Sequence, residues 1–427
     1  MQQDFSTNRR HVIAGLAGVA IALPIAAQAQ VPDLVPDSDA DQTALLQAAL
    51  DSAPGRLSLP AGRFRVSGLR FPSNIIVEGV PGATWLIAGG SAAAGTDGAS
   101  GVVLRDIGFA GETGTEPLVG IGQGKDITFE RCAFRESPGI GLSLYKSIAT
   151  VRDCTFSDHG DAAIHALDCR DLQLSGNRIA GCGNAGIRVW QSQQGVDGSI
   201  VTNNHITRID WRGGGNGQNG NGINVYLADE VIVSNNHITD CAFTAVRLNT
   251  TCNTIVTGNQ CRTCGEVAIF SEFGFSGSII SENLIDGAAT GISITNLDTE
   301  GQIAICANNI VRNITEKSAV NPDTMPVGIL AEAETAVTGN LVTKVPGVGI
   351  AAGWGQFLRN VSITDNIVHD SFIGIGISVA DGAGPVHVSG NQVSGERDGK
   401  IVGLKWRDIA ERDLEANAAR YSHVTVR

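Results

Sequence analysis

Four side chains that could carry acid–base or charge-neutralising chemistry recur at matching places in short, similar segments of this chain. His165, Arg188 and Arg247 each follow a predicted buried aliphatic residue by one position, and Glu272 follows one by three. Proton abstraction beside a sugar carboxylate needs a positive group to neutralise that carboxylate and a base with a suitable pKa. The four are therefore candidate catalytic residues: the arginines as neutralisers, the histidine as base or acid, and the glutamate as acid, base or calcium ligand.

Aromatic and amide side chains occupy the neighbouring positions of the same segments. The candidate substrate-binding residues are Tyr145, Trp190, Trp211, Asn224, Tyr226 and Asn249. Aromatic faces pack against the C–H side of sugar rings, and an arginine fork binds a carboxylate through two hydrogen bonds. The expected partner is therefore an acidic polysaccharide or a cell-envelope glycan.

The sequence does not determine whether the protein is an enzyme. His165 and Glu272 lie four repeats apart, so they cannot easily act on one bond, and no second acid is found in the same columns near Glu272. Inverting hydrolysis needs two carboxyl groups about 6.5–9.5 Å apart. No aspartate cluster typical of a calcium site is seen, so no metal is assigned to these columns, and without a cofactor motif no cofactor is expected. The alternative function is a non-enzymatic envelope scaffold or a protein-interaction solenoid.

A ladder of asparagines identifies the elements that must position these residues. Variants of V-T/S-x-N-x-I/V recur at intervals of 23 to 32 residues. The ladder positions are Asn177, Asn204, Asn236, Asn259, Asn283, Asn309, Asn340, Asn366 and Asn391, and Cys154, Cys132 and Ile107 continue them backward. Such a period indicates a solenoid, and two short alternating strands in each repeat exclude helical repeats. The prediction is an all-β, right-handed parallel β-helix of about 12 coils whose asparagines stack in one column.

Four segments divide the chain. Residues 1–29 are expected to be an export signal, because Arg9-Arg10 precede the apolar run 14–26 and the site Ala27-Gln28-Ala29. Residues 30–103 should form an N-terminal cap with a helix over 39–53 and the first coils. Residues 104–395 should form the main solenoid, and 396–427 a C-terminal cap with a helix over 406–420 and a final strand.

Two resemblances support this division. The acidic, Gln/Ala-rich helix followed by Leu59-Pro60-Ala61-Gly62 resembles the opening of pectate-lyase-like β-helix proteins. The paired-arginine signal plus the repeats resembles a family of twin-arginine-exported repetitive β-helix proteins of unassigned function. The resemblance implies a periplasmic or secreted protein that is not inserted in a membrane once its signal is removed; a Sec-type signal is the alternative.

The net charge bears on the class of partner, and the cysteine positions bear on disulfides and metal binding. The net charge of −13 argues against nucleic acid as a partner. Most of the nine cysteines fall at repeat positions, so they are interpreted first as buried small apolar side chains. A disulfide stays open because Cys241 and Cys264 fall on adjacent coils, and metal binding at Cys261-Arg-Thr-Cys264 stays open as well.

Two insertions break the period at one corner. They follow Asn204 and Asn309 and cover residues 210–221 and 312–325, roughly 19 Å apart along the axis. Such loops often wall a binding face, although neutral drift at a tolerant corner is the alternative. On this face Arg188 and Arg247 are expected to be open to solvent, so that replacing either arginine should change stability little.

Overall fold

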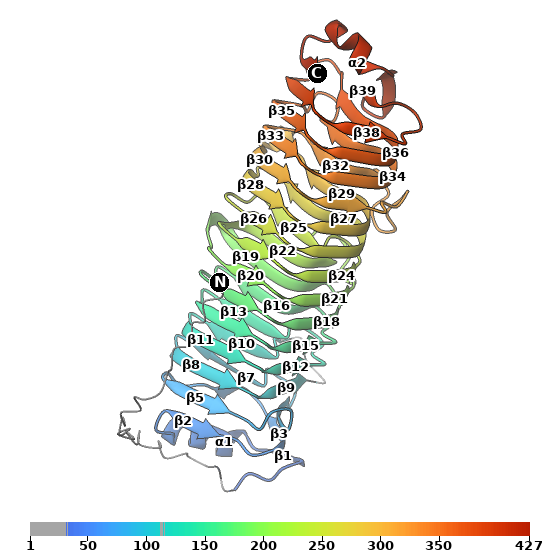
Figure 1. The fold of residues 1–427 in the computed structure, drawn as a ribbon. Helices are drawn as coiled ribbons and strands as arrows, with labels where there is room; N and C mark the ends of the chain where they lie inside the picture. Colours follow the sequence, from blue (N-terminus) through green and yellow to red (C-terminus); the bar gives the residue numbers. More distant parts are fainter. Residues whose placement is uncertain (1–30, 32, 112–113, 115) are drawn as a thin grey trace, which may run out of the picture.

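The computed structural model describes residues 31, 33–111, 114 and 116–427 as one elongated parallel β-helix (Figure 1). The predicted export signal lies outside these residues. One side of the helix is a parallel sheet of 15 strands, one from each coil, running from β2 (Arg56–Ser58) to β41 (Val424–Val426). The prediction of a parallel β-helix is confirmed, with 15 coils rather than about 12, because the first coils and the cap strand also join the stack. Among the described residues, no helix is long and apolar enough to cross a membrane.

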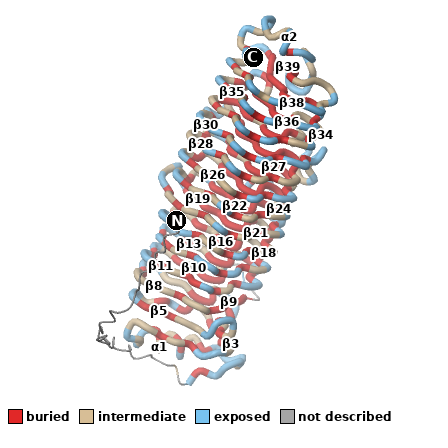
Figure 2. The backbone as a smooth tube through the Cα atoms, viewed as in Figure 1, coloured by how far each residue is buried: buried red, intermediate tan, exposed pale blue. Residues whose placement is uncertain are grey.

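The other sides of the solenoid come from a second sheet of 26 strands, to which most coils contribute twice. The strands that follow the ladder positions from Cys154 onward are β15 (Thr155–Ser157), β18 (Arg178–Cys182), β21 (His205–Ile209), β24 (His237–Cys241), the beginnings of β27 (Gln260–Glu272) and β29 (Leu284–Ile294), β31 (Ile310–Arg312), β34 (Leu341–Ala352), β36 (Ile367–Ser378) and β38 (Gln392–Ser394). The strands on the next side, here called the site face, are β13 (Leu142–Tyr145), β16 (Ala162–Leu167), β19 (Ala185–Val196), β22 (Asn221–Asp229), β25 (Val246–Asn249), the ends of β27 (Gln260–Glu272) and β29 (Leu284–Ile294), and β32 (Val327–Ala331). Buried residues recur in every part of the stack, from the first coils to the last (Figure 2).

The asparagine ladder is confirmed as one continuous column. Each asparagine accepts at Oδ1 from the backbone N–H and the side-chain amide of the asparagine one coil earlier. Each amide also donates to a carbonyl of an earlier strand, as Asn236 does to Val201. Cys154 occupies the next slot, since its N–H donates to Asn177. The ladder therefore satisfies backbone groups at a buried corner that the sheets leave unpaired.

Another interior column changes its composition along the axis. Phe109, Phe134 and Phe156 stack on adjacent coils, with ring centroids 5.2 and 4.5 Å apart. The register continues this column through Ile179 and Ile206. Aromatic rings thus fill this column in three successive coils of the N-terminal half, and mostly branched aliphatic side chains fill it in the coils that follow.

The N-terminal cap differs in detail from its prediction. The helix α1 (Thr43–Ser52) begins four residues later than expected, and Asp39 and Asp41 lie in the preceding strand β1 (Ser38–Asp41). The strand forms because β1 pairs with β3 (Gly62–Val66), and the Asp41 carboxylate accepts from the N–H of Thr43. Leu46 and Leu50 of α1 are buried against the open end of the stack.

At the C-terminus, the helix predicted over 406–420 is wrong. The segment forms an antiparallel pair between β39 (Ile401–Lys405) and β40 (Asp408–Glu411), followed by the short helix α2 (Leu414–Asn417) and a 3₁₀ turn, η2 (Ala418–Arg420). Trp406 has φ of 59°, a left-handed conformation that turns the chain into this hairpin. The final strand β41 is close to the predicted one and pairs with β37 (Val386–Ser389).

All nine cysteines lie within the described residues and are free thiols. Eight are buried, and Cys252 is partly exposed. Cys241 and Cys264 do face each other across adjacent coils, but they are not bonded. Burial raises the pKa of Cys264 to about 12, so these side chains pack as apolar groups.

Candidate functional site

The site face carries two outward columns, and their register agrees with the sequence prediction. Backbone pairing aligns Ser143, His165, Arg188, Asn224, Arg247 and Phe270 in the first column, and Tyr145, Leu167, Trp190, Tyr226, Asn249 and Glu272 in the second. Alternation along each strand points both columns away from the core. The inserted segments then determine which of these side chains solvent can reach.

Arg188 is only 6% exposed and is held by an ion pair. Its two terminal nitrogens donate to the two carboxylate oxygens of Asp161 at 3.0 and 2.9 Å. One of them also donates to Asn219 of the first insertion, at 3.0 Å. This bidentate geometry is the strong form of an arginine–carboxylate contact.

Arg247 is bound by two carboxylates, whereas Arg188 is bound by one. Its Nε and Nη2 donate to Glu272 at 2.6 and 2.8 Å, and its Nη1 donates to Glu266 at 3.0 Å. The side chains of the three residues are 7%, 2% and 3% exposed, respectively. Asn249 adds a hydrogen bond to Glu272 at 3.0 Å. We call Asp161, Arg188, Arg247, Glu266 and Glu272 the ion-pair cluster.

The expectation that the two arginines are open to solvent is wrong, because the first insertion folds over both of them and the second insertion reaches Glu266, a partner of Arg247. A Cβ added to Gly217 of the first insertion would lie 2.4 Å from the Arg247 guanidinium. Asn321 of the second insertion donates to Glu266 at 2.8 Å, across 55 residues of sequence. Loops from two distant coils thus converge on one outward column and bury it.

Asp161 and Glu266 were missed by the sequence analysis. Each lies three residues before the buried isoleucine of its strand, Ile164 or Ile269, whereas only the positions after that residue were compared. The sequence did contain a signal. In both ion pairs, the acid stands three positions before the isoleucine of its own strand, and the arginine stands one position after the buried aliphatic residue of the strand in the adjacent coil. The expectation that no acid adjoins Glu272 is wrong for the same reason, since both Glu266 and Glu272 bind Arg247.

Burial and the ion pairs act on the titratable groups in opposite directions. Burial would raise the pKa of Asp161, but the hydrogen bonds and charge of Arg188 outweigh it and keep that pKa below its usual value. Burial raises the pKa of Glu272 above its usual value, although Arg247 opposes the shift. Burial and then the charge of Arg188 lower the pKa of His165 to about 4, so its imidazole is neutral at pH 7 and a weak base.

One outward acid is buried without a cation. Glu332 is 5% exposed, and its carboxylate accepts from the N–H groups of Asn296 and Leu297 at 2.6 and 3.0 Å. Burial raises its pKa to about 7, and those backbone hydrogen bonds only partly offset the effect. Glu332 thus contrasts with Glu272, whose arginine limits the shift.

A cleft of about 360 Å³ opens beside the ion-pair cluster. It is lined by Trp190, Asn216, Gly217, Gln218, Asn224, Tyr226, Arg247, Asn249, Glu272 and Phe273. Tyr226 is 40% exposed, and its ring lies edge-on to Trp190 at 5.9 Å. Trp190 is oriented by its Nε1–H, which donates to Asn224 at 3.3 Å. The cleft therefore presents an exposed ring next to amide and carboxylate groups.

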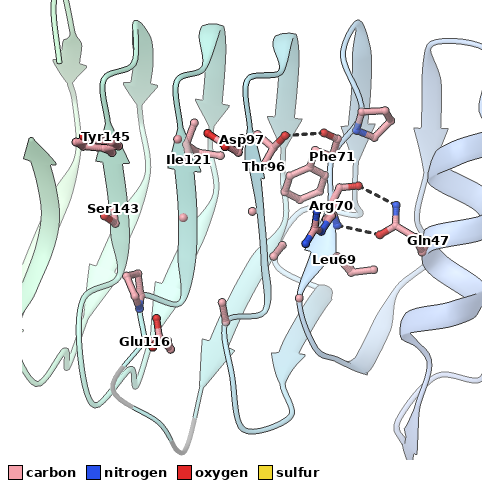
Figure 3. A pocket seen from close by; sticks show the side chains of 18 of the residues that line it. Gln47, Leu69, Arg70, Phe71, Thr96, Asp97, Glu116, Ile121, Ser143 and Tyr145 are labelled. Carbon is pink, nitrogen blue, oxygen red and sulfur yellow. Dashed lines mark hydrogen bonds between the residues drawn. The ribbon is translucent and has the colours of Figure 1, made fainter. Parts of the chain in front are cut away.

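The remaining predicted site residues lie elsewhere. His165 contacts the edge of Trp190, at 5.3 Å between ring centroids, and does not line the cleft. Trp211 packs on Phe243 and donates to the carbonyl of Gly215, which stabilises the first insertion. Tyr145 lies at one end of a separate groove of about 960 Å³ (Figure 3). That groove extends toward α1, where Gln47 forms hydrogen bonds with the backbone of Arg70.

Comparison with known families agrees with this architecture. The family model described as "Right handed beta helix region" matches residues 113–216, 143–310 and 197–358, which together span more than half of the chain. The chain belongs to the right-handed β-helix family. No curated protein sequence matches it significantly.

Solved structures resemble this chain at low identity, some of them with a TM-score above 0.5. The Streptococcus pneumoniae surface protein and adhesin PfbA is 15% identical, with a TM-score of 0.53 over 88% of this chain and 99% of that one. The pre-mature bacteriophage phi29 gene product 12 is 12% identical, with a TM-score of 0.56 over 90% of this chain and 58% of that one. The A-module of the Azotobacter vinelandii mannuronan C-5 epimerase AlgE4 is 16% identical, with a TM-score of 0.47 over 93% and 99%. These likenesses concern the fold alone.

Proposed function

We propose that this β-helix protein binds a polysaccharide, with the cleft beside Tyr226 receiving one part of the glycan. The observation that carries the proposal is the exposed Tyr226 ring next to Asn224, Asn249 and Glu272 in one cleft. A ring offers its apolar face to a sugar, while amide and carboxylate groups bind sugar hydroxyls. Because Trp190 and Glu272 are already fixed by neighbours, binding would require little ordering of the cleft.

The charge of the cleft favours uncharged sugar units over acidic ones. Among the lining residues Arg247 is the only cation, and two carboxylates already neutralise it. The whole ion-pair cluster contains three carboxylates and two guanidinium groups. An acidic polysaccharide, the partner expected from the arginines, would have to separate a buried ion pair before Arg247 could receive it.

Lyase- or epimerase-like processing gains little support from the same geometry. His165 is a weak base and lies outside the cleft, and both arginines that were to neutralise a sugar carboxylate are engaged. Glu272 is the cleft residue whose raised pKa suits proton transfer. Binding without turnover is therefore the function that the cleft supports best.

Glycan-array binding of the full chain tests the proposal. We expect neutral polysaccharides to bind and Tyr226→Ala to weaken binding about ten-fold or more, since stacking is lost. Phe372→Ala is the control, because Phe372 is similarly exposed but lies outside the cleft. Absence of binding to every glycan, or equal binding by the Tyr226 variant, would reject the cleft. A new ultraviolet absorbance on incubation with uronate polymers would assign lyase chemistry instead.

Export is a separate part of the proposal and rests on the sequence of residues 1–29. We propose that Arg9 and Arg10 direct the chain through a twin-arginine route to the periplasm or the outside of the cell. Replacing both with Lys should leave the precursor in the cytoplasm. Normal export of that variant would indicate a Sec-type signal.

A further inference from the structure

A histidine pair lies outside the cleft, on the side of the coils that precedes the site face. The strands β21 and β24 lie side by side in the stack (Figure 1). His205 begins β21, His237 begins β24, and the register pairs the two residues directly. Their Nδ1 atoms are 3.2 Å apart, and the ring planes are inclined by 85°. Both side chains are partly exposed, so an ion could reach them from solvent.

We infer that His205 and His237 form a chelating site for a divalent transition-metal ion of the copper, nickel or zinc class. Imidazole nitrogen is a preferred ligand of these ions, with metal–nitrogen distances of about 2.0–2.1 Å. Two such bonds spanning the observed separation enclose an angle of about 100° at the metal. That angle lies between those of square-planar and tetrahedral coordination, so the separation of the two nitrogens suits one ion once the rings turn their Nδ1 lone pairs toward it.

The protonation states fit this assignment. The Nδ1–Nδ1 contact needs one ring to carry its proton on Nδ1 while the other accepts. Binding of the ion through both Nδ1 atoms moves that proton to Nε2 of the same ring, so no net proton is lost.

The residues beside the histidine pair limit its affinity for a metal ion. Arg178 precedes His205 in the same column and Gln260 follows His237. Within the described residues no group of three or more His, Cys, Asp or Glu side chains could hold a metal ion, so water must complete the coordination. The site is therefore a two-histidine surface chelate, and Arg178 makes it weaker than it would be without that charge.

Isothermal titration of the untagged full chain with Cu²⁺, and separately with Zn²⁺, tests the site. We expect one Cu²⁺ per chain, and His205→Ala or His237→Ala should weaken its binding about ten-fold or more, because one imidazole cannot chelate. His369→Ala is the matched control, since His369 also lies on the outside of the same sheet and its Nδ1 forms a hydrogen bond with Ser394 instead of facing a second histidine. Electron paramagnetic resonance of bound Cu²⁺ should show two nitrogen donors in the wild type and one in either variant.

Circular dichroism checks that the variants fold, and His237→Gln replaces His237→Ala if the alanine variant does not. Unchanged Cu²⁺ affinity in the double variant of His205 and His237, or a larger loss in the His369 variant, would overturn the site. A spectrum with the same nitrogen ligands in wild type and double variant would overturn it too. None of these results bears on the glycan cleft, which lies on a different side of the solenoid.

Discussion

The asparagine ladder and the ion-pair cluster are both buried polar arrays, yet different parts of the chain bury them. The ladder lies inside the coil, where each asparagine is enclosed by its own repeat and the two adjoining ones. The cluster lies outside the coil and is enclosed by insertions that start on other coils. Adjacent repeats of the same motif therefore determine burial in the first array, whereas burial of the second depends on two insertions that interrupt the repeats.

The difference also concerns how the polar groups are satisfied. A ladder asparagine exchanges hydrogen bonds with copies of itself, so losing one member leaves two neighbours incomplete. The cluster balances full charges, so losing one arginine leaves buried carboxylates without a partner. The following predictions test this contrast.

Arg247→Ala should cause the largest loss of stability. It leaves Glu266 and Glu272 buried without their cation, which should lower the free energy of unfolding by about 3–5 kcal/mol at pH 7. Urea denaturation followed by circular dichroism measures the loss. Arg178→Ala is the control: Arg178 is exposed on the same sheet, and its loss should change the value by about 0.5 kcal/mol or less. Equal midpoints for the two variants would mean that the cluster does not contribute to stability.

Asn236→Ala should have the next largest effect. It removes the acceptor of the Asn204 amide and the donor to Val201, so we expect a loss of about 2–3 kcal/mol. Asn391 is the last member of the ladder and is partly exposed, so Asn391→Ala should cost less than half as much. Similar losses at both positions, measured by the same denaturation, would show that the column does not act cooperatively.

Glu332→Gln should change the pH dependence of stability. The raised pKa of Glu332 means that the folded state holds its proton more tightly than the unfolded state does. This contribution is complete below a pH near 4.5 and disappears as pH rises to about 7. The Gln variant keeps an oxygen for Asn296 and Leu297 but loses the titration. Between pH 5 and pH 8 it should therefore gain about 2 kcal/mol relative to wild type; identical pH profiles would contradict the prediction.

Tyr226→Ala should have the smallest effect on stability, below about 1 kcal/mol, because the ring is 40% exposed. Ile223 lies on the same strand but is fully buried, so Ile223→Ala should cost about 2–5 kcal/mol. Thermal unfolding of both variants compares the stability contributed by the outward and the inward side of one strand. A large loss at Tyr226 would show that the open part of the site face is structural, like the cluster.

The fold could be predicted from the sequence because the features that determine it recur in every repeat. The asparagine spacing predicted the ladder, and the alternation around Ile187 and Ile223 predicted which residues share a column. The caps were harder to predict, because they do not repeat. The periodic apolar residues after Trp406 suggested a helix, but pairing of β40 with β39 determines the structure there.

The site could be predicted only in part. Trp190, Asn224, Tyr226, Arg247, Asn249 and Glu272 do meet in one cleft. The repeats do not indicate the path that an insertion takes. The path of the first insertion covers Arg188 and places Trp211 where it stabilises that loop. The histidine pair was overlooked although each member directly follows a ladder asparagine, Asn204 or Asn236, because only the strands of the site face were compared column by column.

The change of filling in one interior column has a consequence for the response of the rod to temperature. Stacked rings such as Phe134 and Phe156 bury more apolar surface in each coil than the aliphatic side chains that replace them after Ile179. Exposure of apolar surface raises the heat capacity of unfolding, whereas exposure of amides such as those of the ladder lowers it. The free energy of the first coils should therefore curve more steeply with temperature, and on deep cooling the N-terminal end of the molecule should be the first to loosen.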